Sequence, residues 1–262
     1  MTTDATPIDR AHAAMQAAPE DDAARLRFFE RLADAELVLL LSRDPEGDSI
    51  DPDLFELPDA SYLLAFDTEE RLAAFAGRAV PYVALSGRTL AGMLAGQGLG
   101  LGLNLGAPSE TLLPAPALDW LAAMLAETPR TVTARPSAVA APSGLPEPLL
   151  PALDAKLAAA EGLAQAACLV AVIYDDGSRG HLLAFLDPLP GAEEALARAT
   201  GEALAFSGIE AGALDVTFLP ASDPAADRIA RVGLRFDIPA PAALPGPPAA
   251  PGMDPDRPPR LR

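Results

Sequence analysis

The chain has 262 residues, enough for one large domain or two small ones, and half of them are hydrophobic, so it can bury a core. Acidic residues outnumber basic residues by 37 to 19, which gives a formal net charge of -18. Such a surface repels nucleic-acid backbones and anionic membranes, because both are bound by clustered basic side chains. We therefore expect neither nucleic acid nor membrane as a partner.

The N-terminal stretch MTTDATPIDRAHAAM is polar and lacks the apolar run of a secretory signal, so we expect a cytoplasmic protein whose frayed N-terminus holds His12. One cysteine, Cys168, lies in the apolar run AACLVAVIY and is expected to be an inert core residue. A single cysteine allows no intramolecular disulfide, which agrees with a reducing compartment. Lys156 is the only lysine, which we interpret as a composition bias towards arginine.

The first half of the chain alternates between helical and strand-like patterns. Helical spacing is seen over 21–34, and the apolar runs 37–41, 61–67 and 81–85 are typical of strands. The intervening stretch 43–59 is rich in Asp and Pro and predicts a loop, without the ligand spacing of a calcium-binding EF-hand. Short helices are expected after Asp67, with a capping box to Glu70, and after Ser86, followed by a helix around Trp120.

The stretch GQGLGLGLNLG (96–106) raises the question of a phosphate-binding loop. Its glycines do not fit the dinucleotide fingerprint, and no GK[ST] follows them. Leucines and glycines alternate instead, which predicts a strand with one leucine face and one bare face formed by Gly98, Gly100, Gly102 and Asn104. Either a neighbouring element packs closely on this bare face, or the face is a shallow contact surface for a partner or ligand, with Asn104 as its polar contact.

The second half begins after a change in composition. Residues 128–148 are rich in Pro and Ala and predict a linker. We then expect a helix with Leu150, Leu153 and Leu157, a hairpin of strands 168–174 and 181–187, a helix over 192–206, and strands 214–218 and 231–238 in an antiparallel sheet. Residues 240–262 are rich in Pro and predict a disordered tail.

No pattern in the chain indicates a catalytic, metal or cofactor site. His12 and His181 have no metal-ligand partner at the usual spacing, and Ser86 and Ser178 lie outside any GxSxG motif. The paired carboxylates Asp175–Asp176 and Glu193–Glu194 lie in a predicted turn and a predicted first helical turn, where acids have structural roles.

The segments SYLLAFDTEERLAAFAG, PYVALSGRTLAGMLA and GQGLGLGLNLG resemble the N-terminal domain of the SseB (enhanced serine sensitivity) family. The segments CLVAVIYDDGSRGHLLAFLD and RIARVGLRFDIP resemble its C-terminal domain, although 236–239 departs from the Pro-Phe-Tyr-like ending of that domain. The resemblance implies a cytoplasmic bacterial protein with no established catalytic site, linked to serine sensitivity and to sulfurtransferase-type partners.

These patterns predict an α+β protein made of two small α/β-sandwich-like domains with mixed or antiparallel sheets. The predicted boundaries are 20–127 for the first domain and 149–239 for the second, with the linker and the tail as given above. We expect a protein that is not an enzyme, has no cofactor and acts as a protein-interaction or accessory module. The alternative is a small-molecule sensor, for an amino acid, that uses the surface near Asn104.

Overall fold

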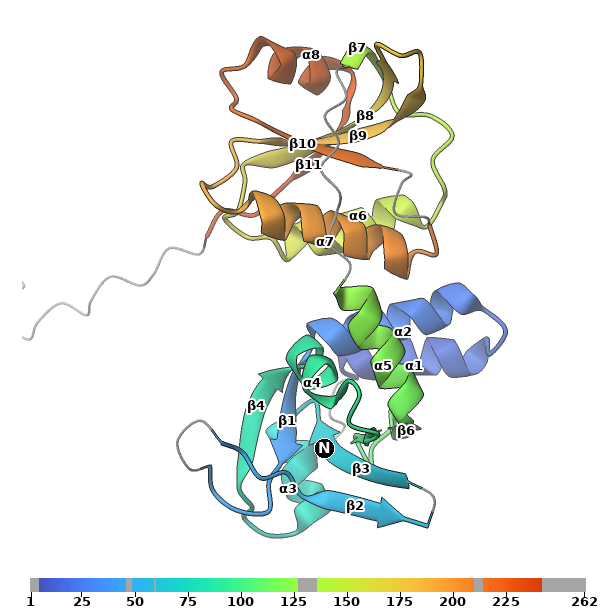
Figure 1. Ribbon diagram of the computed structural model, residues 1–262, viewed down its shortest axis with the longest axis vertical. Helices are drawn as coiled ribbons and strands as arrows, with labels where there is room; N and C mark the ends of the chain where they lie inside the picture. The colour runs from blue at the N-terminus through green and yellow to red at the C-terminus, as the bar shows by residue number, and fades with distance from the viewer. Residues whose placement is uncertain (1–4, 46–48, 59, 127–135, 210–213, 242–262) are drawn as a thin grey trace, which may run out of the picture.

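The computed structural model describes residues 5–45, 49–58, 60–126, 136–209 and 214–241. These residues form an α+β fold with two mixed sheets, one in each half of the chain (Figure 1). Residues 128–135 of the predicted linker and residues 242–262 of the predicted tail lie outside the described residues.

The first sheet has the strand order β4-β1-β3-β5-β6, and β2 pairs with β3 beside β1. The pair of β3 and β5 is parallel, whereas every other pair in this sheet is antiparallel. The strands are β1 (Glu36–Leu40), β2 (Leu54–Leu57), β3 (Ala60–Phe66), β4 (Tyr82–Ser86), β5 (Gly100–Leu103) and β6 (Thr111–Leu113).

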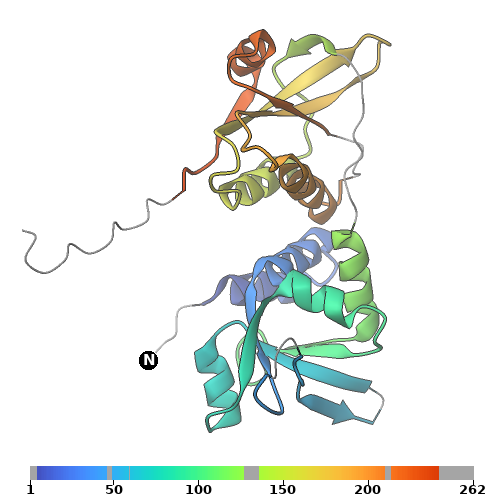
Figure 2. The same cartoon turned by 60° about the vertical axis from the view of Figure 1, so that its left-hand side comes forward.

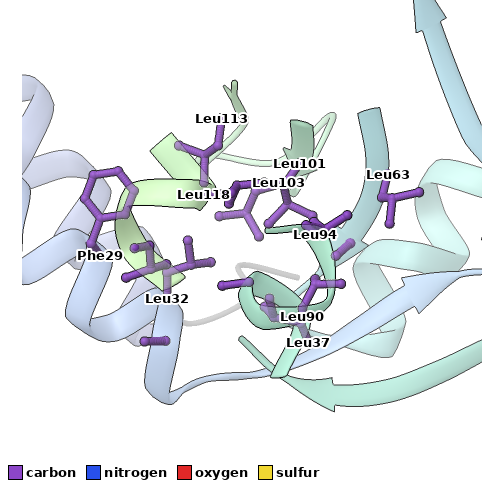
Figure 3. Close-up of a cluster of buried hydrophobic side chains, with 14 of the residues drawn as sticks. Phe29, Leu32, Leu37, Leu63, Leu90, Leu94, Leu101, Leu103, Leu113 and Leu118 are labelled. Atoms are coloured by element: carbon purple, nitrogen blue, oxygen red, sulfur yellow. The ribbon is translucent and has the colours of Figure 1, made fainter. Parts of the chain in front are cut away.

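Helices cover both faces of the first sheet, and the larger core lies on one of them. On that face, leucines of β1, β3, β5 and β6 meet apolar side chains of α1 (Pro7–Ala17), α2 (Asp22–Asp34), α4 (Gly87–Leu94) and α5 (Ala115–Leu125). Figure 3 shows these side chains converging from strands and helices. A smaller cluster on the opposite face joins β1 and β3 to α3 (Glu69–Ala76).

The second sheet has the strand order β10-β9-β8-β11, and β7 also pairs with β8. Its strands are β7 (Pro136–Ala140), β8 (Ala166–Tyr174), β9 (Arg179–Leu186), β10 (Asp215–Leu219) and β11 (Leu234–Asp237). Helices α6 (Leu149–Ala158) and α7 (Glu193–Phe206) pack on one face, and α8 (Pro224–Val232) packs on the other. Figure 2 shows α6 and α7 on the side that faces the first half of the chain.

The main differences from the sequence predictions are elements that lack a strong local pattern. Helix α1 replaces the frayed N-terminus and starts ahead of the predicted domain boundary at residue 20. Strand β2 lies in the predicted acidic loop, and β7 lies in the predicted linker. These two strands are short and mostly exposed, so they show no alternation of buried and exposed residues that a sequence could reveal.

Three further predictions are corrected by the structure. The pair of β9 and β10 is parallel, because α7 crosses between them, so the second sheet is mixed and not antiparallel. The predicted strand 231–238 begins only at Leu234, since Arg231 and Val232 end helix α8. Helix α3 is capped by Thr68, whose hydroxyl accepts from the Arg71 N–H at 3.3 Å, and not by Asp67.

Helix α4 approaches helix α2 closely at Gly87, whose N–H donates to the Ala35 carbonyl at the end of α2 at 2.8 Å. A Cβ atom at position 87 would lie only 1.8 Å from the Leu32 carbonyl oxygen. We therefore expect Gly87→Ala to lower the free energy of unfolding by about 3 kcal/mol, measured by urea denaturation, since backbone and not a flexible side chain must move.

Gly92 in the same helix is the matched control, because it is exposed and a Cβ there would meet nothing within 4 Å. Gly92→Ala should leave stability unchanged or raise it by about 0.5–1 kcal/mol, owing to the better helix propensity of alanine. Equal effects of the two substitutions would contradict the close approach of the two helices.

Candidate functional site

The bare face of the glycine stretch is filled from within the protein. Strand β5 covers only Gly100–Leu103, and Gly98 lies exposed ahead of it with a φ of 69°. A Cβ at Gly100 would lie 2.5 Å from the Tyr62 ring, and one at Gly102 would lie 2.7 Å from the Leu64 side chain. Both glycines are buried, so close packing on this face requires them.

Asn104, the predicted polar contact, is fully buried. Its side-chain Oδ1 accepts from the backbone N–H of Asp67 at 2.9 Å, and its Nδ2 donates to Ser109 Oγ at 2.8 Å. With a φ of 51°, Asn104 occupies a left-handed conformation that asparagine tolerates better than most residues. Gly100, Gly102 and Asn104 are therefore internal, and we correct the hypothesis that this face is a contact surface.

Asn104 belongs to a buried polar group that we call the Arg71 cluster. The cluster joins the start of α1, the end of β3, helix α3 and the segment after β5, and consists of Thr6, Asp9, Asp67, Arg71, Asn104 and Ser109. The Arg71 guanidinium binds both carboxylate oxygens of Asp9, and it lies 2.8 Å from Asp67 Oδ1. Both acids are almost entirely buried, so Arg71 neutralises charges that would otherwise be costly inside the protein.

The hydrogen bonds of the Arg71 cluster favour the charged form of Asp9. Burial alone would raise the pKa of this carboxyl, but the hydrogen bonds from Arg71, Ser109 and Thr6 lower the pKa well below its ordinary value. Ser109 donates its hydroxyl proton to Asp9 Oδ1 at 2.6 Å, and no histidine takes part. The arrangement holds α1 in place against the sheet of its domain.

A second polar group, the Lys156 cluster, lies where the two halves of the chain meet, and three of its five members are buried. It consists of Glu30 and Asp34 from α2, Arg88 from α4, Lys156 from α6 and Glu202 from α7. The Lys156 Nζ lies 2.7 Å from Asp34 Oδ2 and 3.0 Å from Glu202 Oε2. Phe206 at the end of α7 inserts into the core of the first half, and Lys156 lies 5.6 Å from the centroid of its ring.

Arg88 completes the Lys156 cluster from the first half. Its guanidinium donates to both carboxylate oxygens of Glu202, at 2.8 and 3.1 Å, and to Asp34 Oδ1 at 2.7 Å. Burial alone would raise the pKa of Glu202, but Arg88 and Lys156 together lower it. Burial raises the pKa of Glu30, whose Oε1 lies 3.8 Å from Lys156 Nζ and has no hydrogen-bond partner among the described residues.

The role of Lys156 was missed in the sequence, where the single lysine was interpreted as a composition bias. One signal was present, because Lys156 follows Leu153 by three residues and precedes Leu157, and both leucines are buried. A lysine on the apolar side of a helix requires acidic partners when it is buried. Those partners come from two other helices, α2 and α7, and no local pattern identifies them.

The histidines and the cysteine lie in surroundings that favour structural roles. His12 is buried against Phe28, with ring centroids 5.7 Å apart, and His181 Nε2 lies 3.0 Å from the Ser143 carbonyl oxygen. Cys168 is buried as expected, and burial raises the pKa of its thiol. Neither histidine has a nucleophilic side chain among its hydrogen-bond partners in the described part of the chain.

The part of the chain that the structure describes has open surface hollows but no arrangement of side chains for a metal ion. No group of three or more His, Cys, Asp or Glu side chains there is arranged to hold a metal ion. None of the helices in that part is long and apolar enough to cross a bilayer. The open surface hollows of that part include one of about 410 Å³ between α1 and α2 and one of about 310 Å³ beside Asp187 and Phe218.

Comparison with known families identifies the first half of the chain. The family model of the SseB protein N-terminal domain matches residues 9–120, from within α1 to within α5, and so includes the whole first sheet. This match confirms the predicted family for that half, whereas the resemblance of the second half to the SseB C-terminal domain stays a prediction. No curated protein and no solved structure matches the chain significantly.

Replacement of Asp9 tests the Arg71 cluster. Asp9→Asn removes the buried charge that Arg71 binds, so we expect a loss of about 3 kcal/mol in unfolding free energy at pH 7. Because the folded-state pKa of Asp9 is lowered, its contribution is complete above the unfolded-state pKa near 3.9 and declines as the pH falls below that value. Urea denaturation at pH 7 and pH 3 should show the gap between wild type and variant narrowing at acid pH.

Asp22→Asn is the control for Asp9, because the Asp22 side chain is 77% exposed in its ion pair with Arg25. It should change stability by less than about 1 kcal/mol at pH 7. A gap between wild type and Asp9→Asn that stays constant from pH 7 to pH 3 would show that Asp9 does not titrate as described.

Replacement of Lys156 tests the junction between the two halves. Lys156→Met keeps the apolar stem but leaves Glu30 and Glu202 buried with less positive charge, so we expect a loss of about 3 kcal/mol in unfolding free energy by circular dichroism in urea. Arg25→Met, which removes an exposed ion pair, should cost less than about 1 kcal/mol. If the Lys156→Met protein is as stable as the Arg25→Met protein, Lys156 does not stabilise the junction between the two halves.

Proposed function

We propose that this chain, an SseB-family protein through its N-terminal domain, is a non-enzymatic accessory protein that binds an extended segment of a protein partner along strand β2. The single observation that carries the proposal is the exposure of β2. All four residues of this strand are exposed, and Leu54, Phe55 and Leu57 remain 47%, 38% and 39% accessible.

Strand β2 offers both backbone and side-chain contacts. It pairs with β3 on one side, and no strand of the described residues pairs with its other side. An unpaired strand edge presents N–H and C=O groups that can accept an added strand. Phe55 and Leu57 share one face, because alternate residues of a strand point the same way, and the partner's apolar side chains can pack there.

An exposed apolar strand at a sheet edge is a liability for a protein that has no use for it. Natural edge strands are usually protected by charges, proline or a covering element, and β2 carries only Glu56 among its four residues. The hairpin of β2 and β3 lies at the end of the first sheet that is remote from the second half of the chain (Figure 1). The second half therefore leaves this edge accessible.

The polar side chains support a non-enzymatic role. The Arg71 cluster and the Glu30, Lys156 and Glu202 members of the Lys156 cluster are largely buried, and the charged groups of both clusters are mainly bound to one another. Catalysis requires titratable groups in a concave site that a substrate can enter. The small-molecule alternative relied on Asn104, whose amide is already used inside the protein.

We place the protein in the cytoplasm, as the sequence resemblance implies and as a single buried cysteine supports. The family resemblance makes a sulfurtransferase-type protein the first candidate for the partner. An apolar segment of that partner, extended along β2, would satisfy both the free backbone edge and Phe55.

The proposal is tested by affinity capture from a lysate of the source cells, with Phe55→Ser/Leu57→Ser as the variant. We expect a specific protein to bind the wild type and to be reduced about tenfold with the variant, because two apolar anchors are lost. Leu189→Ser is the control, since Leu189 is 53% exposed in the second half. In the purified complex, the amide hydrogens of residues 54–57 should exchange more slowly than in the free protein.

Two outcomes would overturn the proposal. One is retention of the captured protein by the Phe55→Ser/Leu57→Ser variant at the wild-type level. The other is a rise in melting temperature with a single amino acid and no captured protein, which would favour the sensor, because a ligand that binds only the native state stabilises it.

A further inference from the structure

A hollow between α1 and α2 gathers three arginines in a chain that has few basic residues. Arg10 of α1 and Arg27 and Arg31 of α2 line it, and small side chains of Ala11, Ala14 and Ala24 leave a space of about 410 Å³ between the helices. The whole chain holds only 19 basic residues against 37 acidic ones. We call this hollow the arginine site.

The three guanidinium groups make few close contacts with other groups of the described residues. Arg10 and Arg27 are exposed, and Arg31 is partly exposed. The ion pair of Arg27 with Asp21 is 3.7 Å long and that of Arg31 with Glu30 is 3.9 Å long, both beyond a good hydrogen bond. Arg10 donates one hydrogen bond, to the Ala5 carbonyl at 2.5 Å. Most of the guanidinium N–H donors therefore remain free for a ligand.

The spacing of these arginines brings like charges together. Arg27 and Arg31 are four residues apart on one helix, where like charges repel and destabilise the helix slightly. Arg10 adds a third positive charge from the opposite wall. A repulsive arrangement of this kind is relieved when an anion binds between the charges.

We propose that the arginine site binds a carboxylate-rich peptide segment of a partner protein. Arginine forks match carboxylates through paired, charge-assisted hydrogen bonds, and the alanine floor admits a peptide backbone or an apolar side chain. The site lies on the helical side of the first domain, whereas β2 lies at the far end of its sheet, so this binding is separate from the partner contact at β2 (Figures 1 and 2).

The surroundings favour carboxylates over phosphate. Phosphate sites commonly use free backbone N–H groups at a helix N-terminus. At the start of α1 the Asp9 N–H donates to Thr6 Oγ1 at 3.1 Å, and the Thr6 N–H donates to Asp9 Oδ2 at 3.0 Å, so this end is already capped. The positive groups line two opposite walls of a groove between helices, which suits a segment that lies along it.

The probe is a fluorescein-labelled peptide of about ten glutamates, titrated with the full chain and followed by fluorescence anisotropy at about 20 mM and about 150 mM NaCl. We expect binding at low salt, in spite of the net charge of -18, and weaker binding at high salt because ions screen the contacts. Arg10→Gln/Arg27→Gln should weaken binding about tenfold or more, since charge-assisted hydrogen bonds are lost.

The matched control is Arg228→Gln/Arg231→Gln, which removes two exposed arginines from helix α8 of the second half. The control should bind the peptide like the wild type, and both variants should keep the wild-type circular dichroism and melting temperature. Absence of peptide binding by the wild type at low salt would overturn the proposal, as would equal weakening in the control. Displacement of the peptide by equimolar pyrophosphate would also overturn it, in favour of a phosphate site.

Discussion

A charge can be buried in this protein only where an opposite charge is buried with it, and this constraint determines how its elements are joined. Arg71 lies between Asp9 and Asp67 and so fixes the first helix to the sheet of its domain. Lys156 and Arg88 lie around Glu202 and so join the two halves. Both connections link segments that are far apart in the sequence, and the loss of Arg71 or Lys156 leaves buried carboxylates with less positive charge in a medium of low dielectric constant.

The same constraint separates the polar interior from the surfaces that are left for partners. Asn104, Ser109 and Glu202 would all be attractive contacts if exposed, but each is used to satisfy another buried group. The accessible groups that we assign to partner binding are the apolar side chains of β2 and the arginines between α1 and α2. Both kinds suit peptide segments, one through backbone pairing and the other through carboxylates.

Elements with a strong internal pattern could be predicted from the sequence, and the others could not. The apolar runs at Leu37–Leu41 and Ala166–Tyr174, and the helix that Ser86 caps, lie close to where their patterns placed them. Strand β2 forms because β3 offers it an edge, and β7 forms because β8 does so, which is a tertiary effect without local signature. The glycine alternation identified strand β5. The side chains that cover its glycines, Tyr62 and Leu64, belong to β3, and the sequence does not show that β3 lies beside β5.

Because basic residues are scarce, the position of each one is more informative than the composition suggests. In a chain with a net charge of -18, most acidic side chains can remain solvated at the surface without a partner. A basic residue is then informative wherever it is buried or stands beside another, since solubility does not explain it. Lys156, the only lysine, is almost fully buried, whereas Arg27 and Arg31 stand side by side on one helix. The first arrangement is explained by the acids around it, and an anion bound between the arginines would relieve the repulsion in the second.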